Sequence, residues 1–118
     1  MDQHQRDEWE GIVRSAFGPE KHFDVDPGAS DFVALVSWSL PDTNRPNKRS
    51  KTIRLVISRE AVYEYFGKED ESRREQDRQK VVTWIRNKIE SFDPDHDAPH
   101  GQISPEVKWT IRSDVLNS

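Results

Sequence analysis

The 118-residue chain has no cysteine, which excludes disulfide bonds, thiolate metal sites and a cysteine nucleophile. Hydrophobic residues make up only 32% of it, fewer than the 34% that are charged, a balance that without further pattern favours disorder. No apolar run approaches the length that crosses a membrane, and the first ten residues, MDQHQRDEWE, are too polar for a signal peptide. We therefore expect a cytoplasmic protein without a membrane segment.

The formal net charge of -4 argues against unspecific affinity for nucleic acid or anionic lipid. The few apolar residues are not scattered but fall into periodic segments, and four of them are tryptophans, each able to bury a large area. The length is close to the commonest domain size and suffices for one hydrophobic core. These features predict a single folded domain over residues 1–118.

Residues 52–67 predict a strand that runs directly into a helix. Ile53, Leu55 and Ile57 alternate with other residues, as in a strand with one face on a core. Ser58 stands where a helix N-cap belongs, and Gly67 is expected to end the helix in the left-handed conformation. The apolar stripe of this helix consists of Ala61, Val62, Tyr65 and Phe66.

Further elements follow from the same periodicities. An amphipathic helix is predicted over residues 5–17, before Gly18-Pro19, and a second strand over 32–40. Phe23 and Val25 indicate a short extended piece between them. Because the loop 41–51 joins the two long strands directly, an antiparallel hairpin is their simplest pairing.

The second half begins with a charged linker and helix start over 68–80. Ser72 and Glu75 match a capping box, and Asp77 is placed to pair with Lys80 along the helix. The helix then acquires an apolar face up to Phe92, and a mobile loop is expected over 93–101. Alternation over 107–112 predicts a last strand.

The resulting order is α-β-β-α-α-β. Helices on one face of a small antiparallel sheet of three or four strands give a two-layer α+β domain. We predict that fold class.

This order resembles a family of short bacterial proteins known only as a domain of unknown function. The resemblance spans about residues 31–114 and depends on Phe32, the run Ile-Ser-Arg-Glu-Ala-Val at 57–62, the Phe-Gly pair at 66–67, the helix at 81–89 and the strand at 107–111. The N-terminal helix and the long basic loop depart from the family pattern. The resemblance implies the fold and a bacterial source, and it brings no catalytic residue and no ligand.

The loop 41–51 is the first candidate site. Its basic residues outnumber Asp42 by four to one, and a hairpin tip of this charge could contact phosphates. The competing interpretation is an exposed loop that its charge keeps soluble and unpaired. The candidate polyanion contacts are Arg45, Lys48, Arg49 and Lys51.

The second candidate is an acidic and histidine-containing segment in the loop 93–101. Carboxylates and imidazoles bind divalent metals, but here prolines interrupt the segment and remove the helical geometry that would aim two rings at one ion. We expect turn formation and no metal or other cofactor. Its potential ligands are Asp93, Asp95, His96, Asp97 and His100.

Recognised catalytic patterns are absent: there is no glycine-rich phosphate loop, zinc-protease motif or nucleophile elbow. The four tryptophans lie on apolar faces and are expected in the core rather than in a ligand cage: Trp9, Trp38, Trp84 and Trp109.

We therefore expect a non-catalytic binding or regulatory module that acts through contacts with a protein partner. The alternative is a nucleic-acid-binding protein that uses the loop 41–51. A third hypothesis is a metal-assisted enzyme that uses the loop 93–101.

The metal interpretation has a direct test. Because the predicted core stands without the loop 93–101, a chelator should leave the melting temperature unchanged. A rise of several degrees on adding zinc, lost in His96→Ala, would contradict this expectation.

Overall fold

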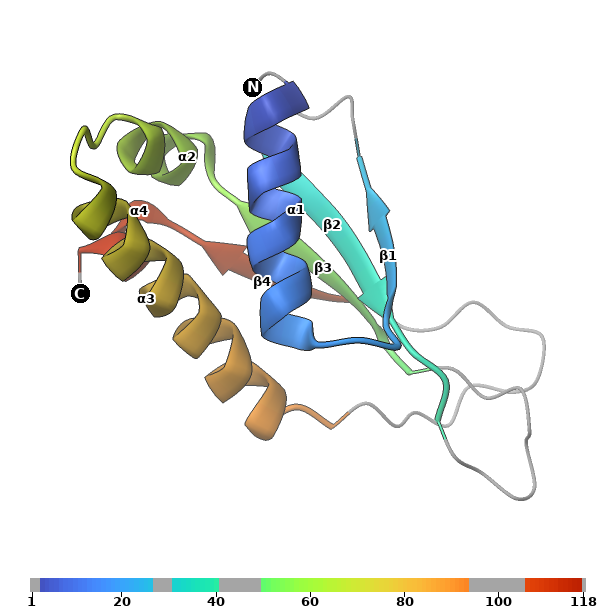
Figure 1. The fold of residues 1–118 in the computed structure, drawn as a ribbon. Helices are drawn as coiled ribbons and strands as arrows, with labels where there is room; N and C mark the ends of the chain where they lie inside the picture. Colours follow the sequence, from blue (N-terminus) through green and yellow to red (C-terminus); the bar gives the residue numbers. More distant parts are fainter. Residues whose placement is uncertain (1–2, 27–30, 41–49, 94–105, 118) are drawn as a thin grey trace.

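The computed structural model describes residues 3–26, 31–40, 50–93 and 106–117. In chain order the elements are α1 (Gln3–Phe17), β1 (His22–Val25), β2 (Phe32–Ser37), β3 (Thr52–Ile57), α2 (Arg59–Phe66), α3 (Glu71–Glu90), β4 (Glu106–Ile111) and α4 (Ser113–Leu116). The predicted α+β class is confirmed (Figure 1). Within the described ranges, no helix is both long and apolar enough to cross a membrane.

The sheet has the strand order β1-β2-β3-β4, so β1 and β4 are its edges. β1 pairs with β2 and β2 with β3 in antiparallel fashion, which confirms the hairpin and the short extended piece at Phe23 and Val25. β4 instead pairs with β3 in parallel, so the sheet is mixed rather than antiparallel throughout. The reason is that α2 and α3 carry the chain back along the sheet, and it enters β4 at the end where β3 began.

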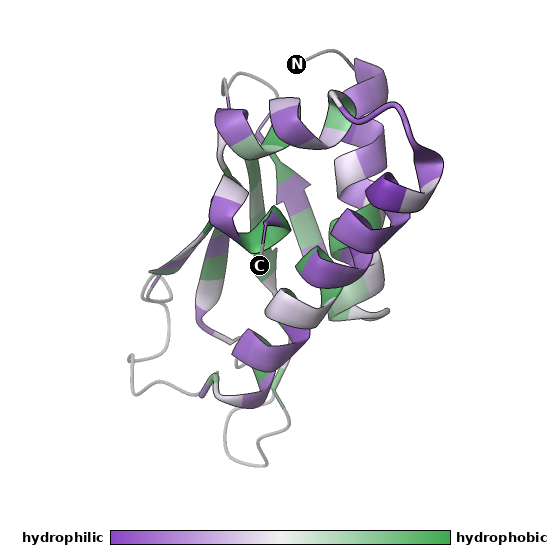
Figure 2. Ribbon diagram, turned by 90° about the vertical axis from the view of Figure 1, so that its left-hand side faces the viewer, coloured by the Kyte–Doolittle hydropathy of each residue, from purple (hydrophilic) through white to green (hydrophobic). Residues whose placement is uncertain are grey.

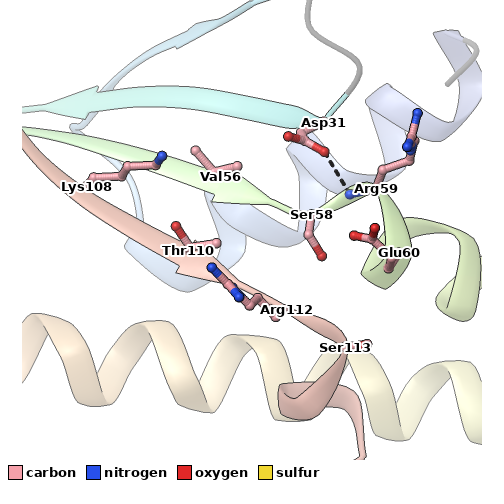
Figure 3. Close-up of a pocket in the computed structure, with 9 residues that line it drawn as sticks. All are labelled: Asp31, Val56, Ser58, Arg59, Glu60, Lys108, Thr110, Arg112 and Ser113. Carbon is pink, nitrogen blue, oxygen red and sulfur yellow. Dashed lines mark hydrogen bonds between the residues drawn. The ribbon is translucent and has the colours of Figure 1, made fainter.

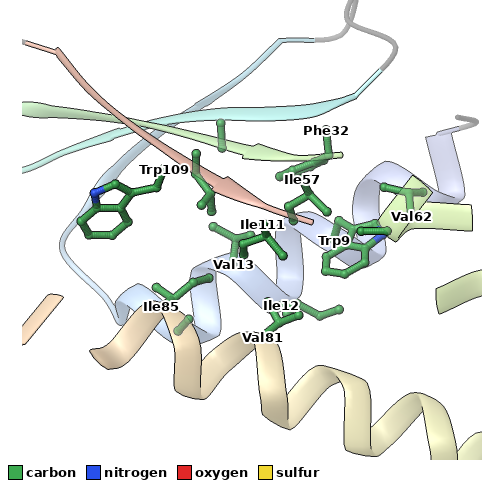
Figure 4. Close-up of a cluster of buried hydrophobic side chains, with 14 of the residues drawn as sticks. Trp9, Ile12, Val13, Phe32, Ile57, Val62, Val81, Ile85, Trp109 and Ile111 are labelled. Atoms are coloured by element: carbon green, nitrogen blue, oxygen red, sulfur yellow. The ribbon is translucent and has the colours of Figure 1, made fainter. Parts of the chain in front are cut away.

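One hydrophobic core lies between the sheet and the helices (Figure 4). Register places Phe32 opposite Ile57 and Ile57 opposite Ile111, all on the face that the helices cover. α1 and α3 pack against them through residues that include Val13 and Ile85. In Figure 2 hydrophobic residues are concentrated in the strands, and the outward sides of the helices are hydrophilic.

The tryptophans divide between the core and its margin. Trp9 is completely buried against Tyr65, with ring centroids 5.1 Å apart, and Trp109 is 7% exposed. Trp38 and Trp84 are only partly buried against the same core. All four therefore contribute to packing, because aromatic side chains bury large apolar areas.

Two helix ends differ from the prediction. The capping box at Ser72 and Glu75 is wrong, because the Asp70 carboxylate accepts the Ser72 N–H at 2.9 Å and α3 begins at Glu71. Gly67 is not left-handed, since its φ is -76°. Glycine relieves crowding there, since a Cβ would lie 3.0 Å from the carbonyl oxygen of Tyr63, a tight contact.

The charged segment 68–80 is more deeply packed than its composition indicates. Asp77 is 1% exposed, and it pairs with Lys68 at 2.6 Å rather than with the predicted Lys80. The Lys80 ammonium instead donates to the carbonyl oxygen of Leu116, at 2.9 Å. These two contacts attach the loop before α3, and the end of the described chain, to the first half of α3.

The Lys68–Asp77 pair predicts a specific energetic pattern. Lys68→Met would leave a buried carboxylate without its partner and should lower the free energy of unfolding by about 3 kcal/mol. Replacing both residues, as in Lys68→Met with Asp77→Leu, should recover most of that loss because no buried charge remains.

Denaturant unfolding measures this pattern, with the exposed Arg73→Met as control. A Lys68→Met variant as stable as the control would show that the pair does not hold the segment in place.

Candidate functional site

The outer face of the sheet is the side opposite the core. Register brings Val33, Val56 and Thr110 into one row across β2, β3 and β4, and Arg54 and Lys108 side by side in the next. Val33 and Val56 are buried but do not belong to the core cluster. Among the described elements no helix covers this face, because all four helices bury their apolar residues in the core on the other side.

A hollow of about 630 Å³ opens on this face, where the ends of β3 and β4 meet the start of α2 (Figure 3). Val56 is the one apolar residue among those that line it. The full lining consists of Asp31, Val56, Ser58, Arg59, Glu60, Lys108, Thr110, Arg112 and Ser113.

The sequence positions the start of α2 through Ser58. Its side-chain oxygen accepts the Ala61 N–H at 3.2 Å, which confirms the predicted N-cap. Its backbone N–H donates to the Ile111 carbonyl at 2.9 Å, so the same residue extends the parallel ladder between β3 and β4. Asp31 accepts the Arg59 N–H at 2.8 Å and attaches the start of β2 to the helix.

Basic side chains enter the lining of the hollow from β4, from the residue after it and from α2: Lys108, Arg112 and Arg59. Lys108, Thr110 and Arg112 alternate with the buried residues of β4, so their side chains share the outer face (Figure 3). In the part of the chain that the structure describes, neither Lys108 nor Arg112 has an acidic partner. Arg54 lies 4.0 Å from Glu106.

Two like charges stand directly opposite each other in this sheet, because Arg54 and Lys108 are register partners. Such a pair is unfavourable across neighbouring strands. An anion placed over β4 would relieve the repulsion and would also find Arg112. The β4 side of the hollow thus offers positive charge to an anion, whereas Asp31 and Glu60 contribute carboxylates to the same lining. Among the described residues, no group of three or more His, Asp or Glu side chains is placed to hold a metal ion.

A second polar cluster joins α2 to α3. The Arg78 guanidinium donates to the Tyr65 hydroxyl and to Glu71, both at 2.8 Å, and also to Glu75. The hydrogen bond from Arg78 lowers the pKa of Glu71, and hydrogen bonds from Gln79 and Arg78 lower the pKa of Glu75. Burial raises the pKa of Tyr65. We interpret this cluster as structural, because each charge has a partner within it.

Most residues of the sites predicted from sequence lie outside the part of the chain that the structure describes. Arg45, Lys48 and Arg49 lie outside the described residues, as do His96 and His100. Lys51 is described and partly exposed, but it precedes β3 and is not among the residues that line the hollow, which β3 and the residue after it reach through Val56 and Ser58.

Sequence reasoning missed the hollow although its signal was present. The alternation over 107–112 predicts an outward set that contains Lys108 and Arg112. The alternation does not reveal that this strand pairs in parallel with β3, and only that pairing places it beside Ser58. Comparisons with family models, with curated proteins and with solved structures gave no match. The resemblance to a bacterial family stays a prediction.

Ser58 and Ser72 are both predicted as helix caps from the sequence, so their alanine variants provide a matched comparison. Ser58→Ala removes the acceptor of the Ala61 N–H and should destabilise the protein by about 1 kcal/mol. Ser72→Ala should change the free energy of unfolding by less than about 0.5 kcal/mol, because Asp70 caps α3. Equal losses in the two variants, measured by chemical denaturation, would contradict the assignment of the caps.

Proposed function

We propose that the protein is a non-catalytic binding module that acts through contacts with another protein, and that the hollow on the outer sheet face is its contact surface. The observation that carries this proposal is a pair of positively charged side chains, Lys108 and Arg112, that have no acidic partner among the described residues. They lie on a sheet face that no described helix covers.

The lining of the hollow favours a macromolecule over a small ligand. Small-molecule pockets are concave and mainly apolar, with a few polar groups that orient the ligand. Here the proportions are reversed, since Val56 is the sole apolar side chain of the lining. Exposed charged groups of this kind steer an oppositely charged partner and fix its orientation. A polar partner surface with acidic side chains fits the hollow.

The same residues argue against catalysis at this place. Ser58 uses its side-chain oxygen as the cap of α2, and the described lining offers neither a histidine nor a cysteine beside it. Glu60 and Asp31 are carboxylates, but the Asp31 oxygen already accepts a backbone N–H of α2. A hydroxyl nucleophile needs a base within hydrogen-bond reach. Among the described residues, no hydroxyl of the lining is hydrogen-bonded to such a base.

We further propose a bacterial protein of the cytoplasm. The resemblance over residues 31–114 supports the source. The location is supported by a chain that contains no cysteine and so builds its core without disulfides, as a reducing compartment requires.

Affinity capture with matched variants tests the proposed contact surface. Lys108→Glu with Arg112→Glu reverses the charge of the hollow, and Arg73→Glu with Arg86→Glu reverses two exposed charges of α3 as a control. Both variants should keep the wild-type melting temperature, since exposed charges contribute little stability. We expect one protein to be retained by the wild type and by the α3 variant and lost, by at least about tenfold, with the hollow variant.

Capture is carried out with and without nuclease. A partner retained equally by all three proteins would place the contact elsewhere and contradict the proposal. Retention that nuclease abolishes would favour the nucleic-acid alternative.

A further inference from the structure

We propose that the partner of this site is an extended acidic segment that adds to the sheet as a further strand along β4, with its acidic side chains over Lys108 and Arg112. This inference rests on the proposed function and specifies how the contact is made. It follows from the backbone of the edge strand, from the charge beside it and from a second hollow on its helical side.

The backbone of β4 has one paired and one free side. The Ile111 carbonyl accepts the Ser58 N–H, so the backbone N–H and C=O of Ile111 point toward β3. In a strand these directions alternate from residue to residue, so Trp109 also points toward β3 whereas Lys108 and Thr110 point away from it. β4 is an edge of the four-stranded sheet, and among the described residues no group pairs with that side of Lys108 and Thr110.

An added strand would therefore find donors and acceptors in place. Each of the two outward-pointing residues offers one N–H and one C=O, and an extended peptide can bond to these groups whatever its sequence. Selectivity then comes from its side chains, which alternate between the two faces of the sheet.

On the outer face the neighbours of such a strand would be Lys108 and Arg112, both exposed. Glu106 lies on the same face but is close to Arg54. Lys108 and Arg54 repel each other as register partners, so acidic side chains of the added strand would gain attraction to β4 and also reduce an existing repulsion. Charge complementarity thus favours glutamate or aspartate at alternate positions.

On the helical side a second hollow, of about 350 Å³, lies between α3 and α4, the turn of helix that follows β4. It is lined by Trp84 and Val115, with the polar side chains of α3 around them. Trp84 meets Trp109 of β4 at a ring-centroid distance of 6.4 Å, and Val115 belongs to the turn of helix that follows β4. The positions of the added strand that face the helices would accordingly be apolar. The full pattern is acidic and apolar residues in alternation.

A second copy of the chain fits this edge less well. Two β4 strands side by side would bring together two sets of Lys108 and Arg112, each balanced only by a Glu106 that already lies near Arg54. A nucleic-acid strand would satisfy the charges, but its backbone has no N–H groups for the carbonyls of Lys108 and Thr110. We therefore favour an acidic segment of a partner protein.

The test uses a blocked synthetic peptide of the length of β4, in which glutamate alternates with valine. Its affinity for the full chain is measured by calorimetry, and its position by amide shifts in nuclear magnetic resonance spectra. We expect binding with shifts at Lys108 and Thr110, and a loss of at least about tenfold in affinity in Lys108→Glu with Arg112→Glu.

The decisive comparison changes the peptide and not the protein. Methylation of every backbone nitrogen keeps the glutamates and removes the strand donors, so affinity should again fall by at least about tenfold. A methylated peptide that binds as tightly as the original would overturn strand addition. This comparison stands even if the charge-reversed variant does not fold.

Two further results would overturn the inference in favour of another occupant. One is a single-stranded oligonucleotide that binds more tightly than the peptide and displaces it. The other is a dimer of the free protein in sedimentation that Thr110→Pro dissociates, since proline at an edge position removes one outward N–H.

Failure of the inference and failure of the proposed function are distinguishable. If strand addition is wrong, the methylated peptide binds fully while capture still depends on the hollow. If the proposed function is wrong, the charge-reversed variant retains the captured partner.

Discussion

The parallel pairing of β3 with β4 is the constraint on which the rest of the structure depends. A parallel neighbour cannot be reached by a tight turn, so the chain must return along the sheet through α2 and α3 before it enters β4. That return places both helices on the core face, and it leaves β4 at the edge of the sheet. Among the described residues, an outer sheet face without a helix and an edge strand without a further neighbour are two consequences of this one connection.

Ser58 takes part both in the parallel pairing and in the start of α2. Its backbone continues the ladder with Ile111, and its side chain starts α2 by accepting the Ala61 N–H. A residue that ends a strand and begins a helix fixes the angle between the two elements. The hollow owes its position to this junction, because the start of α2 forms one wall and the outward side chains of β4 form the other.

The sequence predicts the elements well where periodicity is strong and poorly where the outcome depends on long-range contacts. The strand at Thr52–Ile57, the N-cap at Ser58 and the burial of Trp9 follow from local pattern and are confirmed. Asp77 does not follow from it, because a carboxylate in a charged run is expected in solvent and only the fold reveals that Lys68 reaches it. Gly67 shows the same limit: local rules favour a left-handed cap, whereas the backbone there is right-handed and a Cβ would crowd the Tyr63 carbonyl.

The candidate site was less predictable than the fold for a related reason. The alternation of the last strand predicts that Lys108 and Arg112 share one face. Which side chains lie next to them depends on the strand that pairs with it. An antiparallel partner would have set other neighbours against them. Lys51, a candidate chosen for the composition of its loop, precedes β3, whereas Val56 and Ser58 line the hollow at the other end of that strand.

Amide hydrogen exchange along β4 of the free protein tests the central claim, that β4 is an edge strand whose alternate residues, Trp109 and Ile111, are bonded to β3. The amides of Trp109 and Ile111 should be protected by their bonds to β3, and those of Lys108 and Thr110 should exchange much faster because they face solvent. Slow exchange at all four amides, or protection at Lys108 and Thr110 with fast exchange at the other two, would contradict the account.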